Sequence, residues 1–589
     1  MNLLDEGKRR VNHEIETFNC DWYWEWDGFE MKAYTADFET TTDADDCRVW
    51  AVGICDIDDS EKFMYGNSME WFMDWCEVHA NCKLYFHNLA FDGAFIMDWL
   101  ERNGWLWVED VKQASDCTYT TLISDMNQIY SITLFFTPTF RVRIYDSLKI
   151  IPLSVAQMAK AYNLPILKAD LDYEEYREPG HELTDEEVFY LNHDVKITAL
   201  VLKQFLDEGM TKMTAGSNAL FGYKKMLGGD KMFRRVYPEL TDEEDAFIRK
   251  AYRGGFTYAA PQFKNQMQGE GLVYDVNSLY PSVMRYSALP KGSPKWFEGH
   301  PSEDTFRPLW VACVSLSFTL REGFIPVIQL KGNYRFRQTE YLSDSQGVVT
   351  ITVTNVDWEL ITKHYHVSNV EWHGGYSFCA MDTMFAKYVD YWTEVKIKAG
   401  QEHNAGKRQI AKLMLNSLYG KFATRTEVLS RRPEIIGGVL KYVDLEPQTR
   451  KPVYLPVGVF ITAYARFKTI SAAQDHYDRF MYADTDSIHL RGSEVPKDLD
   501  IDDFRLGAWK LESSFKRGKY LGAKCYVEEP WDEDEPLNVH VAGLPKSCHK
   551  HVTMENFAVG AKYDGKLYQK RVAGGIVLEE GPMEIRERL

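Results

Sequence analysis

The segment Tyr482-Ala483-Asp484-Thr485-Asp486-Ser487 sets two carboxylates two residues apart, between two runs of β-forming residues. Residues 480–483 and 487–490 form those runs, so the pattern predicts a β-hairpin with a polar tip. Two carboxylates held this close together cannot both stay charged without compensation. Either the pKa of one of them rises, or the pair binds a cation. Hard carboxylate oxygens bind Mg²⁺, which is what phosphoryl transfer requires. Taken alone, Asp-Thr-Asp also fits a solvated acidic turn.

A third acid follows an apolar strand farther upstream. The segment Leu272-Val273-Tyr274-Asp275-Val276-Asn277-Ser278-Leu279-Tyr280-Pro281 predicts a strand that delivers Asp275. Ser278 and Pro281 then indicate a turn into a helix. A lone aspartate at a strand end is more often a helix cap than a ligand, so Asp275 also needs support from the rest of the chain.

Residues 407–421 predict a helix that Gly420 ends. Three polar residues recur at intervals of four, with a tyrosine beside them, and the apolar residues point the other way. The polar face consists of Arg408, Lys412, Asn416 and Tyr419. One interpretation is an ordinary amphipathic helix. The other is a helix that grips a triphosphate with Lys412 and supports an incoming base with Tyr419.

The N-terminal third carries a second group of acids. The period of a strand puts Asp37 and Glu39 on one face, and Asp92 follows later beside an aromatic residue and a turn. A capping box at residues 184–187 opens a helix that presents Tyr190 and Asp194 on one face. Each acid alone fits a cap or a solvated charge. Together, four acids and a tyrosine that orients water fit a two-metal nuclease.

In this order, the motifs resemble those of a known family. Asp275 to Pro281, Lys412 to Gly420 and Tyr482 to Ser487 are similar to motifs A, B and C of family B DNA polymerases. The N-terminal acids are similar to the Exo I, II and III motifs of DEDDy proofreading exonucleases. Two further elements, Tyr252-Arg253-Gly254-Gly255 and Lys524-Cys525-Tyr526, resemble motifs of the protein-primed phage polymerases of the phi29 type.

This resemblance implies an α/β multidomain architecture. We expect a ribonuclease-H-like 3′-5′ exonuclease domain, then a right-hand polymerase domain of palm, fingers and thumb with two terminal-protein-region insertions. The expected order is an N-terminal extension (1–30), exonuclease (31–215), first palm segment (216–286), first insertion (287–387), fingers (388–426), second insertion (427–450), second palm segment (451–543) and thumb (544–589). The extension has no role in the family pattern.

The resemblance also implies a role for individual residues. For catalysis it implies Asp275, Asp484 and Asp486 in the polymerase, and Asp37, Glu39, Asp92, Lys168, Tyr190 and Asp194 in the exonuclease. For the nucleotide it implies Tyr280, Lys396, Lys412 and Tyr419; about four extra residues between the two lysines depart from the family pattern. For DNA it implies Thr40, Asn88, Phe91, Ser147, Leu148, Tyr252, Gly254, Gly255, Lys524 and Tyr526.

The implied cofactor is Mg²⁺, in two-metal sites where Mn²⁺ can substitute. Its expected ligands are Asp275, Asp486 and the Val276 carbonyl in the palm, and Asp37, Glu39, Asp170 and Asp194 in the exonuclease. The implied partners are template-primer DNA, dNTPs and a separate terminal protein as primer. A phage-encoded protein in the host cytoplasm follows from the same resemblance.

Bulk composition agrees with this interpretation without deciding it. The net charge is −19, which does not favour DNA binding, but local distribution matters more than the sum. Residues 387–426 carry eight basic side chains against three acids, and residues 514–524 carry four and no acid. The ten cysteines include no Cys-x-x-Cys pair, so neither a zinc ribbon nor a redox motif is indicated. No apolar run is long enough for a membrane span, so no membrane association is expected.

Three functions from different classes are therefore compared. The first is a DNA polymerase with proofreading, which the presence of all the motifs in order favours. The second is a 3′-5′ exonuclease whose C-terminal region only binds DNA, and complete A, B and C motifs argue against it. The third is a non-catalytic replication scaffold, which the presence of every metal carboxylate argues against.

Overall fold

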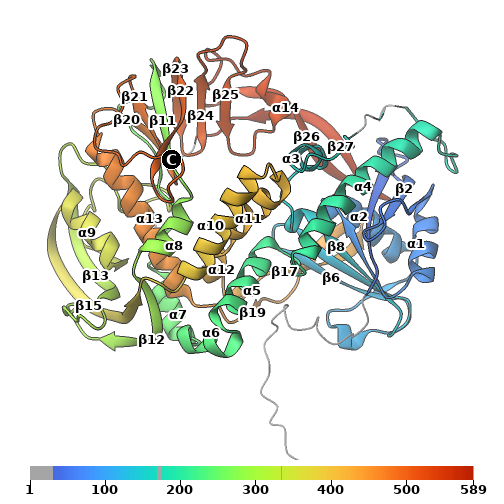
Figure 1. Cartoon of the computed structure of the whole chain (residues 1–589), viewed down its shortest axis with the longest axis horizontal. Coiled ribbons are helices and arrows are strands. Elements are labelled where there is room, and N and C mark those ends of the chain that lie inside the picture. Colours follow the sequence, from blue (N-terminus) through green and yellow to red (C-terminus); the bar gives the residue numbers. More distant parts are fainter. Residues whose placement is uncertain (1–30, 169–170, 172–174, 333–334, 588–589) are drawn as a thin grey trace, which may run out of the picture.

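The N-terminal third of the chain folds around a mixed β-sheet (Figure 1). The computed structural model describes residues 31–587, apart from 169–170, 172–174 and 333–334. The extension 1–30 and Asp170 therefore lie outside the described residues. The strands from this part of the chain are β1 (Ala33–Thr40), β2 (Val49–Asp56), β3 (Phe63–Gly66), β4 (Cys82–Phe86), β5 (Leu106–Trp107), β6 (Thr118–Ser124), β7 (Ile129–Phe135) and β8 (Arg141–Asp146).

The topology of this sheet is ribonuclease-H-like, as expected. Strand β1 pairs antiparallel with β2, which pairs with β3, and it pairs parallel with β4, which pairs with β8. The parallel crossovers need helices, and these cover the sheet. The helices are α1 (Met69–Val78), α2 (Leu89–Arg102), α3 (Val155–Ala161) and α4 (Asp185–Asp207). Phe38, Phe72 and Phe86 pack edge to face in the core between the sheet and these helices.

Two strands from far along the chain extend the same sheet. The hairpin of β17 (Ser430–Ile436) and β18 (Val439–Asp444) pairs with the outer edge of β6, where Ser430 lies opposite Ser124. The sheet therefore runs in the order β18-β17-β6-β7-β8-β4-β1-β2-β3, with β5 on the remaining part of the β6 edge. Most of the segment expected to form the second insertion is thus continuous with the exonuclease sheet.

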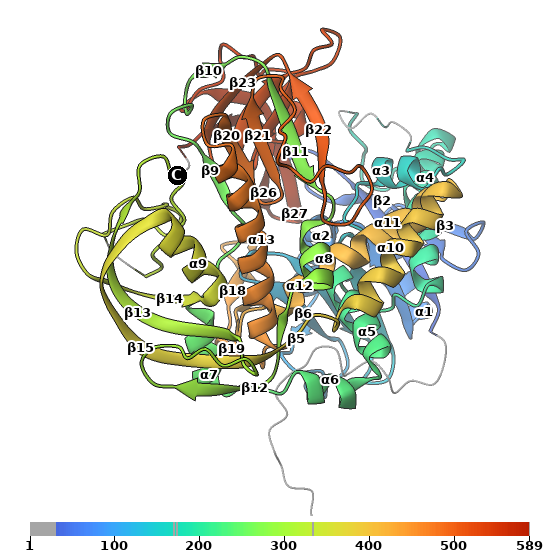
Figure 2. The same cartoon turned by 60° about the vertical axis from the view of Figure 1, so that its left-hand side comes forward.

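A five-stranded sheet of order β22-β11-β21-β20-β9 forms the expected palm. Its strands are β9 (Thr257–Ala259), β11 (Gly271–Val276), β20 (Phe480–Asp484), β21 (Ser487–Arg491) and β22 (Trp509–Phe515). Helix α8 (Leu279–Tyr286) follows β11, as Ser278 and Pro281 predict. Helix α13 (Leu455–Asp475) is buried along most of its length and packs on β20 and β21 (Figure 2).

A separate four-stranded sheet occupies most of the expected first insertion. Its order is β12-β15-β13-β14, and helix α9 (Asn355–His364) packs on it. The strands are β12 (Leu289–Phe297), β13 (Leu309–Leu320), β14 (Val349–Thr354) and β15 (Tyr365–Met381). Helix α13 contacts β12 at one end and the palm strands at the other, so it joins the two sheets. Helices α5 (Ala215–Leu227), α6 (Asp230–Val236) and α7 (Asp242–Arg249) connect the exonuclease to the palm.

The expected fingers are helices α10 (Ala386–Gln401) and α11 (Ala405–Ser417), followed by the short α12 (Tyr419–Phe422). The prediction that Gly420 ends the main helix is wrong. Helix α11 ends at Ser417, and Gly420 lies inside α12, where its φ is not positive. Leu418 and Phe422 are fully buried, so packing of this turn decides the boundary rather than the glycine.

The C-terminal part of the chain ends in a hairpin that packs against the exonuclease sheet and its helix α2. Strands β10 (Met267–Gln268), β23 (Arg517–Gly522), β24 (Cys525–Glu529) and β25 (Asn538–Val541) form one sheet, and α14 (Lys546–His549) follows it. The last hairpin, β26 (Lys562–Val572) with β27 (Gly575–Glu584), contacts α2 and β18 (Figure 2). The Arg571 guanidinium lies 3.7 Å from the centre of the Tyr442 ring. No helix among the described residues is long and apolar enough to cross a bilayer.

Candidate active sites

The tip of the β20–β21 hairpin holds the first group of acids. Asp484 ends β20, Asp486 precedes β21, and Thr485 between them has a φ of 63°. Three backbone hydrogen bonds fix this turn: Thr485 N–H donates to the Phe256 carbonyl, Asp486 N–H to the Asp484 carbonyl, and Val276 N–H to the Asp486 carbonyl. The strand–turn–strand prediction from the sequence is confirmed.

The third acid comes from the neighbouring strand. In β11, Asp275 lies opposite Ser487 of β21, directly after the hairpin tip. Burial and the nearby Asp486 carboxylate raise the pKa of Asp275 to about 7, and burial also raises the pKa of Asp486. Neither side chain forms an ion pair among the described residues. Two crowded carboxylates without a counter-ion are the donor set that a divalent cation stabilises.

Asp484 differs from the other two acids because it already has a cationic partner. The Lys524 Nζ lies 2.7 Å from Asp484 Oδ1, and the Thr257 hydroxyl lies 3.2 Å from the same oxygen. The backbone N–H of Lys524 also donates to the Tyr482 hydroxyl. Lys524, in the element Lys524-Cys525-Tyr526, is therefore bonded to the hairpin that carries the acids. Tyr526 is buried among Tyr482, Tyr520 and His489.

The polar face of α11 points out of the packing, as the spacing predicts. Lys412 and Arg408 are exposed, whereas Ile410 and Met414 are buried. On α10, burial lowers the pKa of the half-buried Lys396, and the positive charges of Arg408 and Lys412 lower it further. The Lys412 charge also lowers the pKa of Asp275, which places this lysine on the side of the palm acids.

An aromatic pair joins the fingers to the palm. The rings of Tyr280 on α8 and Tyr419 on α12 stack with centroids 4.0 Å apart. Burial and the Tyr419 ring raise the pKa of Tyr280 above its ordinary value. The sequence put these two tyrosines in separate motifs, and the structure brings them into contact.

The Tyr252-Gly255 element lies against the hairpin tip. A Cβ atom added to Gly255 would lie 2.7 Å from Thr485 Cγ2, so only glycine fits there without displacement. The space beside Gly254 is open. Arg466 of α13 donates to the Arg253 and Gly254 carbonyls, which holds the element on the palm.

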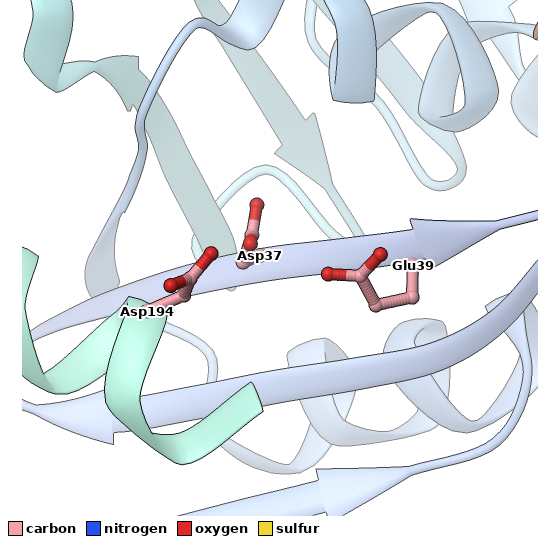
Figure 3. Close-up of side chains that lie close together, drawn as sticks. All are labelled: Asp37, Glu39 and Asp194. Carbon is pink, nitrogen blue, oxygen red and sulfur yellow. The ribbon is translucent and has the colours of Figure 1, made fainter. Parts of the chain in front are cut away.

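The second centre lies in the exonuclease sheet. Asp37 and Glu39 project from one face of β1 toward Asp194 on α4 (Figure 3). Each offers a ligand oxygen within 4.8 Å of the others, and among the described residues this is the only such group of three acidic, histidine or cysteine side chains. Burial and the Asp194 charge raise the pKa of Asp37 to about 7, and burial and the Asp37 charge raise that of Glu39 well above normal. This oxygen-only set fits a hard divalent cation.

Three more expected residues surround this group. The Thr184 capping box opens α4, as predicted, and Tyr190 and Asp194 follow one turn apart. The Lys168 Nζ lies 2.6 Å from Asp194 Oδ2 and 5.5 Å from the centre of the Tyr190 ring. Asp92 lies in the first turn of α2, where burial and the Asp37 charge raise its pKa well above normal.

The residues expected to hold a frayed 3′ end differ in accessibility. Thr40 ends β1 beside Glu39, and Phe91 lies half-buried in α2 against Phe95. Leu148 is also half-buried. Ser147 is fully buried, and its hydroxyl donates to the Phe86 carbonyl, so its DNA contact stays a prediction that this arrangement does not favour.

Sequence reasoning missed two kinds of residue near the centres. Asp146, which ends β8, accepts the backbone N–H groups of both Asn88 and Leu148, and this holds together two expected DNA-contact segments. Lys510 and Glu512 of β22 are close enough to the palm acids to affect the pKa of Asp275. No motif marks them, and only the pairing of β22 with β11, which no local pattern predicts, would have found them.

Comparison with known proteins agrees with this fold and these centres. Residues 78–179 and 170–503 match the family described as DNA polymerase type B, organellar and viral. The DNA polymerase of Bacillus phage Nf is 44% identical over 94% of this chain and 100% of that protein. The DNA polymerase of Bacillus phage phi29 is 42% identical over 94% and 99%, respectively. A structure of phi29 DNA polymerase with primer-template DNA and incoming nucleotide covers 95% of this chain and 100% of that chain, at 41% identity and a TM-score of 0.89.

The chain therefore belongs to the type B DNA polymerases, and within them to the phi29 type. The exonuclease and right-hand polymerase architecture expected from the sequence is confirmed. The enzyme is a DNA-directed DNA polymerase, so the non-catalytic scaffold and the nuclease that only binds DNA are set aside. The two relatives named above are proteins of Bacillus phages. The domain boundaries and the roles of single residues stay predictions.

Proposed function

We propose that this polymerase uses two separate metal-dependent centres, one that extends a DNA primer and one that removes nucleotides from its 3′ end. The observation that carries the proposal is the presence of two groups of crowded acids on one chain, in each of which burial raises the pKa of two carboxylates: Asp275 and Asp486 in one, Asp37 and Glu39 in the other. Asp275 and Asp486 form the palm group, and Asp37, Glu39 and Asp194 form the exonuclease group.

The proposed cofactor at both centres is Mg²⁺, with Mn²⁺ as a substitute. When bound, it supplies positive charge to the phosphate under attack and lowers the pKa of the attacking hydroxyl or water. Asp275, Asp486 and the Val276 carbonyl would hold it in the palm. Asp37, Glu39 and Asp194, with Asp170 as an additional candidate, would hold it in the exonuclease. Oxygen-only ligand sets support this assignment, as does the finding that no described residue forms an ion pair with Asp275 or Asp486.

In the polymerase centre, the primer 3′ hydroxyl attacks the α-phosphate and pyrophosphate leaves. Lys412 and Lys396 bind the triphosphate from the fingers side. Tyr280 lies beneath the sugar, crowds a 2′-hydroxyl and so favours dNTPs, while Tyr419 supports the base. The stacking of the two rings supports a shared platform for the nucleotide. Lys524 and Tyr526 orient the primer through the turn that is tied to Asp484.

In the exonuclease centre, Tyr190 orients the attacking water and Lys168 stabilises the charge that develops on the phosphate. The 2.6 Å contact of Lys168 with Asp194 supports its place beside the reacting group. Asp92 completes the acidic set. Thr40, Asn88, Phe91 and Leu148 hold the single-stranded end, with Phe91 stacking on a base, while the buried Ser147 supports the backbone beside them. Tyr252, Gly254 and Gly255 lie where DNA passes between the two activities.

The proposed partners are template-primer DNA, dNTPs and a terminal protein. The similar phi29 structure contains primer-template DNA and incoming nucleotide, which supports the first two. For initiation, a hydroxyl of the terminal protein replaces the primer end. Since the polymerases of phages Nf and phi29 are similar over nearly the whole chain, we propose that the enzyme replicates a linear phage genome in the host cytoplasm, with strand displacement.

A primer-extension assay with and without dNTPs tests the two activities together. Extension with dNTPs and shortening without them is the expected result. Shortening under both conditions would restrict the chain to the nuclease activity, and inertness would contradict both parts. A separate incubation with a candidate terminal protein and labelled dNTP tests priming, for which covalent attachment of dNMP to that protein is expected.

A further inference from the structure

A lysine of the palm sheet faces the polymerase centre from outside every motif. In the antiparallel pair of β11 and β22, Lys510 lies directly opposite Asp275. Directly opposed residues in such a pair project from the same face of the sheet, with Cβ atoms about 5 Å apart. The Lys510 side chain therefore starts next to the catalytic carboxylate, and it is exposed.

The positive charge of Lys510 affects groups on both the palm and the fingers. The Lys510 charge lowers the pKa of Asp275 in the palm, and it also lowers the pKa of Lys396 on the fingers helix α10. Register places Lys510 beside Asp275, and the effect on Lys396 means that helix α10 also lies within range of the Lys510 charge. Helices α10 and α11 pack on α8, the helix that follows Asp275.

The charges of Lys412 and Lys510 both act on Lys396, so three ammonium groups share this region. Within the described part of the chain, Lys396, Lys412 and Lys510 form no ion pair and no hydrogen bond through their side chains. Lys407 and Lys398 on the same helices, in contrast, pair with Glu208 and Glu402. Like charges held close together repel one another unless an anion lies among them. A polyphosphate is an anion that three such groups can share.

We propose that Lys510 binds phosphate at the polymerase centre, contacting the triphosphate of the incoming dNTP and the pyrophosphate that leaves. The proposal deepens the polymerase function proposed above and rests on it. Because Lys396 and Lys412 come from fingers helices and Lys510 from a palm strand, the bound phosphates join these two elements. The fingers lysines then hold one side of the polyphosphate and Lys510 the other.

The test compares Lys510→Ala, Lys510→Gln and Lys510→Arg in the full-length enzyme. Losing one charge-assisted contact to phosphate should raise the KM for dNTP about ten- to a hundredfold in the first two variants. The inhibition constant of added pyrophosphate should rise by a similar factor, since the product uses the same contact. Arginine should restore both constants to within about threefold, because it also donates to phosphate.

A matched control is Lys497→Ala, which removes an exposed lysine from the loop between β21 and β22. It should leave both constants unchanged. A rise in the Mg²⁺ requirement of Lys510→Ala, with unchanged constants for dNTP and pyrophosphate, would overturn the proposal by assigning Lys510 to Asp275. Weakened duplex binding with unchanged constants would overturn it in favour of a DNA contact. Failure of the parent enzyme to extend a primer would instead contradict the proposed function.

Discussion

Gly255 and Thr485 are in direct contact, although 230 residues separate them in the sequence: a Cβ atom on Gly255 would lie 2.7 Å from Thr485 Cγ2 and 3.1 Å from its Cβ. Thr485 is the residue between the two acids of the hairpin tip, and its N–H donates to the carbonyl of Phe256, next to Gly255. The glycine therefore allows the element that links the exonuclease to the palm to close over the catalytic turn.

Replacing Gly255 with alanine should displace that turn and slow primer extension by about ten- to a hundredfold, since small misplacements of catalytic groups are costly. Degradation of single-stranded DNA should persist. The melting temperature should also fall, and Gly254→Ala is the matched control for packing because the space beside Gly254 is open. Equal melting temperatures for the two variants would contradict the close contact.

Asp486→Asn and Asp275→Asn should each reduce extension by roughly a thousandfold or more, because an amide cannot supply the anionic metal ligand. Degradation of single strands should remain, which also shows that the variants fold. The assay is extension of a labelled primer under dNTP saturation. Near-parental extension by either variant would refute the assignment of the palm acids.

The double substitution Asp37→Ala with Glu39→Ala should abolish 3′-5′ degradation and leave extension intact. It removes two of the three carboxylates that lie within 4.8 Å of one another. The measurement is the rate of digestion of a mismatched primer end without dNTPs. Digestion at the parental rate would mean that the nuclease site lies elsewhere.

Lys412→Ala should impair use of dNTP while sparing duplex binding, because its side chain is exposed on the face of α11 that lies toward Asp275. Steady-state kinetics over dNTP concentration measure the first effect, and gel shifts over a salt series measure the second. A lysine that contacts only the DNA backbone would instead weaken binding and reduce the salt slope by about one. Lys407→Ala, on the same helix but paired with Glu208, is the control.

The stability of the enzyme should depend on pH and on metal together. The pKa values of Asp37 and Asp275 are about 7 in the folded metal-free protein, above the value of about 4 for unfolded aspartate. The folded state holds extra protons between these values, so metal-free stability should fall as pH rises from about 4 to about 7 and level off above that. Because a bound cation displaces these protons, the increase in melting temperature on adding Mg²⁺ should grow over the same range.

Thermal unfolding with a chelator and with Mg²⁺, measured across that pH range, tests the linkage. Asp37→Asn and Asp275→Asn each remove one of the titrating groups, so each should flatten part of the metal-free profile. A metal-induced shift that stays constant with pH would contradict the raised pKa values.

Local patterns predicted the parts of both centres that lie within one strand or helix. The period of β1 predicted that Asp37 and Glu39 share a face, and the Thr184 capping box predicted the start of α4. The hairpin at Asp484 and Asp486 was also predicted from neighbouring residues alone. These features depend on contacts between close neighbours in the chain, which sequence patterns describe well.

Features that depend on distant pairing could not be predicted. The ion pair of Lys524 with Asp484, the position of Lys510 opposite Asp275 and the stacking of Tyr280 on Tyr419 all require strands or helices from separate segments to meet. The prediction of where the α11 helix ends was wrong for a related reason. Gly420 has the sequence signature of a helix stop, but burial of Leu418 and Phe422 continues the helical turn through it.

The shared edge of β6 has a consequence for synthesis of the chain on the ribosome. Strand β17 reaches that edge only after roughly 300 further residues have been translated, which takes about 15 to 60 s at bacterial rates. During this interval β5 covers only the part of the edge at Thr118 and Tyr119, and the outer edge at Ile123 and Ser124 has no strand beside it. Unpaired strand edges recruit other chains. A nascent chain, or a fragment that ends before residue 430, is therefore exposed to association at the β6 edge, which β17 covers in the finished protein.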